Sequence, residues 1–270
     1  MTILQAVILG AIQGLAEFLP ISSSGHLAVA EYFFKQQDLP ILFDIMLHVA
    51  TLAAVCAVFF KKIWSLLCVL GRFIIRKPQP QDKENQKLIL NLIIATFFTG
   101  ILGLLLKDWV KTVNVKFVPI FFIITGSILI FSSLIKPGEK TKEKKSFISA
   151  IVTGIAQGIG VIPGISRSGI TISASIFSGM NREKAGEFSF LLSIPAILAA
   201  FILELKSADN LQAAVSPFSL IAGMAAAFIV GYFSLKFLLN LIKKGKLAYF
   251  SFYLIPAGII LSIYFWGFAA

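Results

Sequence analysis

Six long apolar stretches constrain the fold of this chain more than any other feature. They cover about residues 39–60, 88–106, 117–135, 185–205, 217–241 and 247–268. A helix needs roughly 20 mostly apolar residues to cross the hydrocarbon core of a membrane. Each stretch is continuous, whereas the strands of a membrane barrel are short and alternate. Hydrophobic residues make up 57% of the chain and charged residues 14%, against about 25% charged in soluble domains. The sequence therefore predicts an all-α polytopic membrane protein.

An internal repeat divides the chain into two halves. Residues 10–25, GAIQGLAEFLPISSSG, align without a gap with residues 154–169, GIAQGIGVIPGISRSG, and seven positions are identical. With one inserted residue, the similarity continues from residues 43–54 to residues 188–199. A repeat of this kind indicates that one structural unit occurs twice.

We interpret the chain as a single membrane domain, 1–270, with a first repeat at 1–135 and a second at 146–270. In each repeat the shared segment is a short apolar helix that is broken by Pro, Gly and Ser and resumes near 24–34 or 168–180. Backbone can break at membrane depth only where protein or water satisfies it, so we expect two re-entrant helical hairpins. Three spans follow each hairpin, which gives the repeats inverted topology and places the functional site near the midplane.

The basic residues predict the orientation in the membrane. The loops on one face hold 17 Lys or Arg residues and those on the other face hold 5. Because cytoplasmic loops are enriched in Lys and Arg, we expect the first face to be cytoplasmic. It comprises 61–87, 136–145, 181–184 and 242–246. The first hairpin then opens to the outside. The net charge of +11 thus reflects orientation rather than nucleic-acid binding, since no loop is long enough for a binding module.

A few charged residues lie inside the apolar hairpins, where ionised side chains are costly. The first hairpin carries Glu17 and His26, and the second carries Arg167. Gln13 lies four residues before Glu17 and therefore shares its helix face. If the two hairpin tips meet, these groups share one cavity.

Hydroxyl groups surround these charges in both serine turns. They belong to Ser22, Ser23, Ser24, Ser166, Ser168 and Thr171. Hydroxyls, a guanidinium and backbone N–H groups at helix starts bind anions. A carboxylate and an imidazole can move protons, and a serine beside a base can take part in covalent phosphoryl transfer. The pattern therefore predicts a site for an anionic substrate.

Structural interpretations of these polar residues stay open. A Glu–Arg pair can hold helices together, and serines in apolar helices often pack closely or bond back to the backbone. We interpret His48 as a packing or supporting residue rather than a catalyst. Asp44 and Glu187 lie near span starts, where the helix dipole tolerates acids, and are interpreted as structural.

Two motifs resemble those of a known family. QGLAEFLPISSSGH at 13–26 resembles the (E/Q)xxxE plus serine–histidine motif of bacterial undecaprenyl-diphosphate phosphatases, also called bacitracin-resistance proteins. PGISRSGIT at 163–171 resembles that family's PGxSRSxxT motif. The resemblance covers essentially the whole chain, including its length, its spans and both motifs in order.

The resemblance implies hydrolysis of undecaprenyl pyrophosphate to the monophosphate and phosphate in the bacterial cytoplasmic membrane, which recycles the carrier lipid for cell-wall polymers. It implies that Glu17, Ser23, His26 and Arg167 are catalytic, with Ser23, His26 or water as the nucleophile. Gln13 and the remaining turn hydroxyls would bind substrate. A divalent cation, Mg²⁺ or Ca²⁺, is also implied, with Glu17 as a ligand. Gln13 stands where many members have glutamate, which weakens a two-carboxylate metal site.

Two other functions fit part of this pattern. Type 2 phosphatidic acid phosphatases share an SGH and an SR element, but residues 168–182 contain no His or Asp to serve as that class's nucleophile. A transporter or flippase for a lipid phosphate or other anion would also use inverted repeats with broken helices. Release of orthophosphate distinguishes a phosphatase from either carrier. The expected partners are the polyprenyl pyrophosphate lipid and the bilayer, and the sequence also allows a homodimer.

Overall fold

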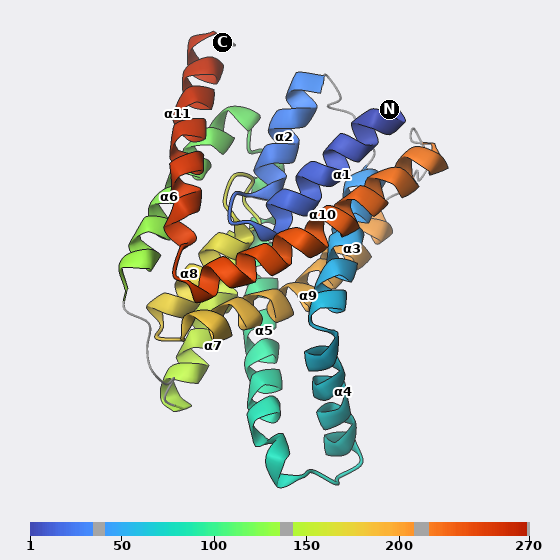
Figure 1. The fold of residues 1–270 in the computed structure, drawn as a ribbon, viewed down its shortest axis with the longest axis vertical. Helices are drawn as coiled ribbons and strands as arrows, with labels where there is room; N and C mark the ends of the chain where they lie inside the picture. The colour runs from blue at the N-terminus through green and yellow to red at the C-terminus, as the bar shows by residue number, and fades with distance from the viewer. Residues whose placement is uncertain (35–40, 136–142, 208–215, 269–270) are drawn as a thin grey trace.

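The computed structural model describes residues 1–34, 41–135, 143–207 and 216–268, and these ranges contain helices and no strand (Figure 1). The helices are α1 (Ile3–Phe18), α2 (Ser23–Phe34), α3 (Ile41–Val58), α4 (Phe60–Ile74), α5 (Lys83–Lys111), α6 (Val118–Leu134), α7 (Glu143–Ile159), α8 (Arg167–Phe177), α9 (Arg182–Ser207), α10 (Pro217–Lys243) and α11 (Ser251–Gly267). Short 3₁₀ turns at Pro80–Asp82, Val115–Phe117 and Leu247–Phe250 precede α5, α6 and α11. The predicted all-α fold is confirmed.

Within the described residues, five helical segments are long and apolar enough to cross a membrane. They are α5, α6, α9, α10 and α11, and a sixth span results if α3 and α4 are counted together. Large apolar side chains lie on the outer surface, as expected where lipid rather than water surrounds the protein. Phe218 and Phe252, for example, are 78% and 79% exposed. The chain is a multi-pass membrane protein.

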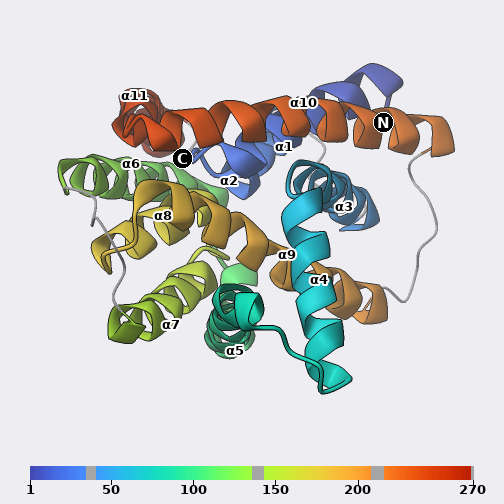
Figure 2. The ribbon, with the colours of Figure 1, turned by 60° about the horizontal axis from the view of Figure 1, so that its bottom comes forward.

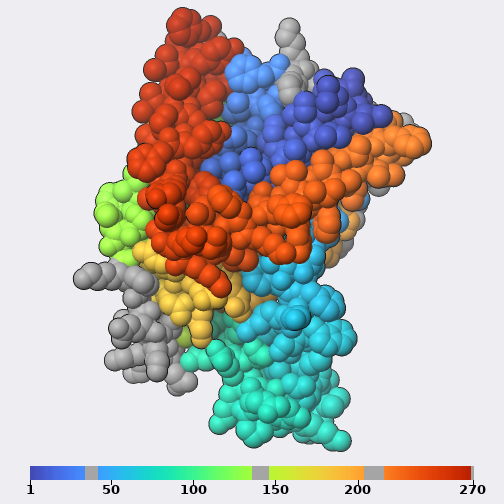
Figure 3. Space-filling view, viewed as in Figure 1, coloured from blue at the N-terminus to red at the C-terminus, as the bar shows by residue number. Residues whose placement is uncertain are grey.

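The helix predicted over 39–60 is α3, but the loop predicted to follow it was wrong in its first part. The helix that begins at Ile41 ends at Val58, and the next helix bends away from it by 81°. Residues 60–74, predicted as part of a cytoplasmic loop, form α4. Apolar residues recur along α4 at helical spacing while Lys61, Lys62 and Arg72 keep it basic, which makes an amphipathic helix rather than a loop. Together α4 and α5 project from one end of the molecule (Figure 3).

Each half of the chain packs against the other. Helix α1 lies along α10, and α7 lies along α5 (Figures 1 and 2). The contacts are close, since a Cβ atom added at Gly10 would collide with the carbonyl of Gly223. At the equivalent position of the second repeat, a Cβ atom on Gly154 would collide with the carbonyl of Ala95. The two equivalent helices therefore make equivalent contacts, each with a helix of the opposite half.

The breaks between α1 and α2 and between α7 and α8 meet inside the molecule (Figure 1). A Cβ atom on Gly25 would lie 2.9 Å from the Cα atom of Gly164, so only glycine allows the two turns to approach this closely. Gly164 also has a φ of +96°, which side chains rarely tolerate. The meeting of the two turns brings α2 and α8 together at their first residues.

Candidate active site

Glu17 is the centre of the polar groups at the meeting of the two turns. Its side chain is 4% exposed and lies near the end of α1. One carboxylate oxygen, Oε2, accepts a hydrogen bond of 2.6 Å from the Ser23 hydroxyl and one of 3.1 Å from Nε2 of Gln13. The other oxygen, Oε1, pairs with the guanidinium of Arg167. The two halves of the chain are therefore joined by a buried ion pair.

Arg167 is held at the first turn of α8. Ser166 caps this helix, and its hydroxyl accepts a hydrogen bond of 3.1 Å from the backbone N–H of Gly169. The Arg167 side chain is 17% exposed, which leaves part of the guanidinium open to a ligand. Because helices α2 and α8 both start here, their positive dipole ends add to the positive charge of the guanidinium. The combination favours an anion.

The first turn places Ser23 by means of an unusual backbone conformation at Ser22. This buried residue has a φ of +72°, in the left-handed region that residues other than glycine seldom occupy. Its hydroxyl accepts a hydrogen bond of 3.3 Å from the N–H of Gly25, which holds the turn. Ser23 follows as the first residue of α2, with its hydroxyl 2.6 Å from Glu17. Strain of this kind is characteristic of functional sites.

His26 does not face Glu17 in this structure. Its Nδ1 lies 2.8 Å from the carbonyl oxygen of Ser22, and its Nε2 lies 2.7 Å from the hydroxyl of Tyr253 in α11. A carbonyl oxygen only accepts hydrogen bonds, so Nδ1 carries the hydrogen, and in the neutral ring Nε2 accepts from Tyr253. The imidazole is stacked between Phe122 and Tyr253. The predicted grouping therefore holds for Glu17 and Arg167 but places His26 at the edge, against α11.

The remaining predicted residues form a hydroxyl layer under Arg167. The hydroxyls of Ser166 and Ser168 lie 3.2 Å apart, and both residues are 1% exposed. The Thr171 hydroxyl is 2.8 Å from the carbonyl oxygen of Arg167 and also contacts the hydroxyl of Ser189. Ser24 is half-buried, and its hydroxyl makes no hydrogen bond to another described residue. Substrate binding by this layer stays a prediction.

His48 belongs to the site, although the sequence predicts only a packing or supporting role for it. Its Nε2 lies 3.7 Å from Oε2 of Glu17. It comes from α3, which neither serine motif includes, so no local pattern points to it. Asp44, interpreted as structural, lies one turn earlier and contacts the same imidazole.

Comparison with known proteins identifies the family of this chain. A sequence profile of the family described as bacitracin resistance protein BacA matches residues 6–260. The chain belongs to this family. Relatives named undecaprenyl-diphosphatase include one from Treponema denticola, 71% identical over 269 residues and the whole of both chains. Others come from Carboxydothermus hydrogenoformans, 42% identical, and Methanosphaera stadtmanae, 40% identical, each over 96% of both chains. The resemblance inferred from the two motifs is confirmed.

In this BacA-family chain the described residues form no preformed metal centre. No group of three His, Cys, Asp or Glu side chains among them is arranged to hold an ion. Both oxygens of Glu17 are already engaged, and Oε1 of Gln13 is the one buried oxygen beside it without a partner. Mg²⁺ usually binds through one or two carboxylates together with substrate phosphates. The described side chains therefore do not fit a dedicated cation site.

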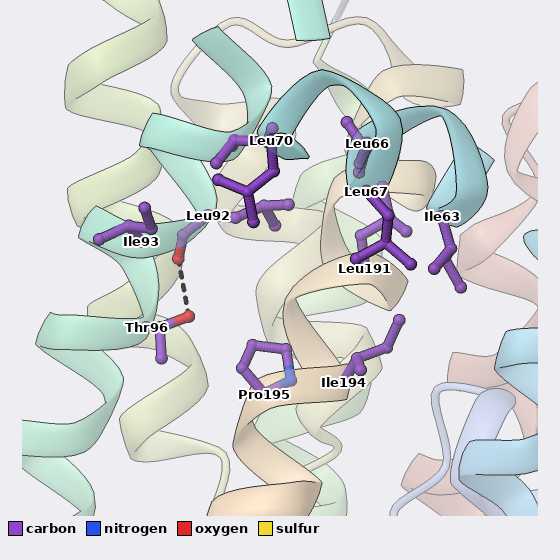
Figure 4. Close-up of a pocket in the computed structure, with 11 residues that line it drawn as sticks. Ile63, Leu66, Leu67, Leu70, Leu92, Ile93, Thr96, Leu191, Ile194 and Pro195 are labelled. Carbon is purple, nitrogen blue, oxygen red and sulfur yellow. Dashed lines mark hydrogen bonds between the residues drawn. The ribbon is translucent and has the colours of Figure 1, made fainter. Parts of the chain in front are cut away.

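An apolar hollow of about 450 Å³ lies between α4, α5 and α9 (Figure 4). Its walls are Ile63, Leu66, Leu67, Leu70, Ile89, Leu92, Ile93, Thr96, Leu191, Ile194 and Pro195. The hydroxyl of Thr96 donates to the carbonyl oxygen of Leu92, so its hydrogen is not available to a ligand. This hollow suits hydrocarbon and offers nothing to a diphosphate, which leaves the Glu17–Arg167 pair as the candidate headgroup site.

Proposed function

We propose that this chain hydrolyses undecaprenyl diphosphate to undecaprenyl phosphate and orthophosphate. The observation that carries the proposal is a single buried carboxylate that contacts a serine hydroxyl on one oxygen and an arginine on the other. Glu17, near the end of α1, supplies a base, while Ser23 and Arg167, at the starts of α2 and α8, supply a nucleophile and an anion binder. The names of the relatives support the same reaction.

The reaction would use these groups in order. The guanidinium of Arg167, the turn hydroxyls and the N–H groups of α8 bind the diphosphate. Glu17 accepts the proton of Ser23, whose oxygen bonds to the terminal phosphorus. The bond from this phosphorus to the bridging oxygen breaks, and the lipid monophosphate leaves with the electron pair. Water then attacks the phosphoserine, the Ser23 oxygen takes a proton, and orthophosphate is released.

The contacts favour Ser23 over His26 as the nucleophile. Ser23 Oγ is 2.6 Å from a carboxylate oxygen, whereas both ring nitrogens of His26 already have partners in Ser22 and Tyr253. A nucleophile requires a free lone pair and an adjacent base. In this conformation His26 fits the role of a support for the first turn. A requirement for Mg²⁺ or Ca²⁺ stays a prediction; since the described residues form no dedicated site, such an ion would bind with the diphosphate.

The finer architecture is also part of the proposal. The two repeats, 1–135 and 146–270, would form one domain with inverted topology, and each helix–turn–helix pair would be a re-entrant hairpin. The first helix of each repeat packs against a helix of the other repeat, α1 against α10 and α7 against α5. This reciprocal pairing supports the symmetry. The cytoplasmic membrane, a first hairpin that opens outward, and a role in cell-wall carrier recycling and bacitracin resistance follow from the charge distribution and the family. A homodimer stays a prediction that particle mass in detergent can check.

Purified protein in detergent with undecaprenyl diphosphate provides the test. We expect stoichiometric release of orthophosphate and lipid monophosphate. Ser23→Ala should abolish release, while Ser127→Ala is the control, since the Ser127 hydroxyl only donates to the backbone of its own helix. Movement of intact lipid diphosphate across vesicles without phosphate release would contradict the proposal and identify a flippase instead.

A further inference from the structure

His48 lies beside Glu17 but belongs to neither serine turn. It projects from α3, and its Nε2 is 3.7 Å from Oε2 of Glu17. The same oxygen accepts the hydrogen bond from Ser23. None of the proposed reaction steps uses this imidazole.

The opposite side of the His48 ring is fixed by its own helix. Nδ1 lies 2.9 Å from the backbone carbonyl oxygen of Asp44, so Nδ1 carries a hydrogen and donates it. The Asp44 carboxylate is 3.7 Å from the same nitrogen. One nitrogen is thus anchored to α3, and the other is directed at Glu17. A histidine is typically oriented in this way when one nitrogen acts on a neighbouring group.

Glu17 needs a second partner because Arg167 has another task. A carboxylate that is 4% exposed is strongly destabilised when a cationic partner leaves it. In the proposed reaction, Arg167 must turn part of its guanidinium from Glu17 to the diphosphate. Gln13 can still donate to Oε2, but it is uncharged, and Ser23 loses its hydrogen during attack. Among the described residues, the ion-pair contacts of Glu17 are to Arg167 and His48.

We propose that His48 is a positioning residue for Glu17, an inference that rests on the proposed function. It keeps Oε2 of Glu17 within reach of Ser23 while Arg167 engages the diphosphate. Asp44 supports it by fixing the ring. His48 acts through Glu17 rather than on the substrate, so its removal should slow the chemical step more than it weakens substrate binding.

Variants at position 48 test this role through phosphate release from undecaprenyl diphosphate in detergent. His48→Leu removes both ring nitrogens at similar size, and we expect kcat to fall about tenfold to a hundredfold, as when a catalytic group is misplaced, with KM changed less than about threefold. His48→Gln keeps a donor and should recover part of the loss. Ser193→Ala is the matched control, because the internal repeat aligns Ser193 of α9 with His48. It should keep the wild-type rate.

A double-variant comparison separates positioning from a general loss of structure. If His48 acts only through Glu17, adding His48→Leu to Glu17→Gln should leave the residual rate unchanged within about twofold. A merely structural histidine would lower that residual rate by the same factor as it lowers the wild-type rate. The residual rates are measured at high enzyme concentration, and thermal unfolding in detergent checks that each variant is folded.

The outcomes separate this inference from the proposed function. A folded His48→Leu enzyme with wild-type kcat, or an equal loss in the Glu17→Gln background, would overturn the inference alone. A wild-type protein that releases no phosphate would overturn the proposed function and this inference with it. If His48→Leu does not fold, His48→Asn replaces it with the same expectation, because its side chain is too short to reach Glu17.

Discussion

At the scale of single residues, the unusual feature is a carboxylate with partners on every side. Glu17 contacts Gln13 of its own helix, α1, and three residues of other helices. These are Ser23 of α2, His48 of α3 and Arg167 of α8. Burying a carboxylate costs several kcal/mol unless charges and donors compensate. An apolar side chain would fill this space at lower cost if the role were packing alone. The arrangement is therefore best explained by chemistry at Glu17.

Glu17→Gln should lower turnover at least about a hundredfold while the protein stays folded, because an amide cannot accept the Ser23 proton. Gln13→Ala should cost less, since Gln13 only donates to Glu17. Steady-state phosphate release measures both. Help by a general base is worth about 10²–10⁴-fold, so a Glu17→Gln enzyme with more than about a tenth of the wild-type rate would exclude Glu17 as the base.

Arg167→Lys should keep the charge and the fold but lose most of the hydrolytic activity. The planar guanidinium can bind two phosphate oxygens in one plane, whereas an ammonium cannot match that geometry. The loss should appear in kcat if the contact tightens in the transition state, and in KM if it only holds the headgroup. Near-normal phosphate release by a folded Arg167→Lys protein would instead assign Arg167 to a purely structural ion pair.

At the scale of the helices, close packing between the halves depends on residues without side chains. Gly10 of α1 faces the backbone of α10 at Gly223. Gly10→Ala places a methyl group against a carbonyl that is fixed in a helix, so we expect destabilisation of about 1–3 kcal/mol, as for other overpacked sites. Gly103→Ala in α5 is the control, because a Cβ atom there meets nothing within 4 Å. Thermal unfolding midpoints in detergent measure the difference, and equal midpoints for the two variants would contradict the close-packing argument.

The helices also mark what the sequence could and could not predict. Both helix breaks, five of the spans and the Glu17–Arg167 pairing follow from apolar length, turn residues and the repeat. The bend after Val58 carries no proline or glycine signal and is decided by tertiary packing. Two features of the site were also out of reach. Tyr253 is 227 residues from His26, and His48 reaches Glu17 across an interface, so no local spacing could reveal either contact.

At the scale of the whole molecule, the orientation in the membrane can be tested on α5. This helix has 29 residues, about 43 Å at 1.5 Å per residue, so its two ends lie on opposite sides of a hydrocarbon core of about 30 Å. Single cysteines replace Lys77, just before it, and Lys111, at its end, in a chain whose Cys56 and Cys68 are changed to serine. Both positions are exposed.

A membrane-impermeant thiol reagent applied to intact cells should label position 111 and spare position 77 until the cells are opened. This result follows from the excess of Lys and Arg on the face that includes Lys77. Labelling of position 77 alone in intact cells would reverse the orientation, and the first hairpin would then open to the cytoplasm.

The pairing of α1 with α10 also determines how early the fold can form while the chain is being synthesised. The first helix leaves the ribosome before its main partner, which begins at Pro217, has been made. Until then the side of α1 around Gly10, which packs against the backbone of α10 in the finished protein, stays uncovered. Glu17 is then not yet held in its final position. The ion pair with Arg167 therefore closes late, after insertion of the second half. A chain that stops short of α10 should accumulate as a membrane-inserted but inactive intermediate, prone to degradation, even though it contains both serine turns.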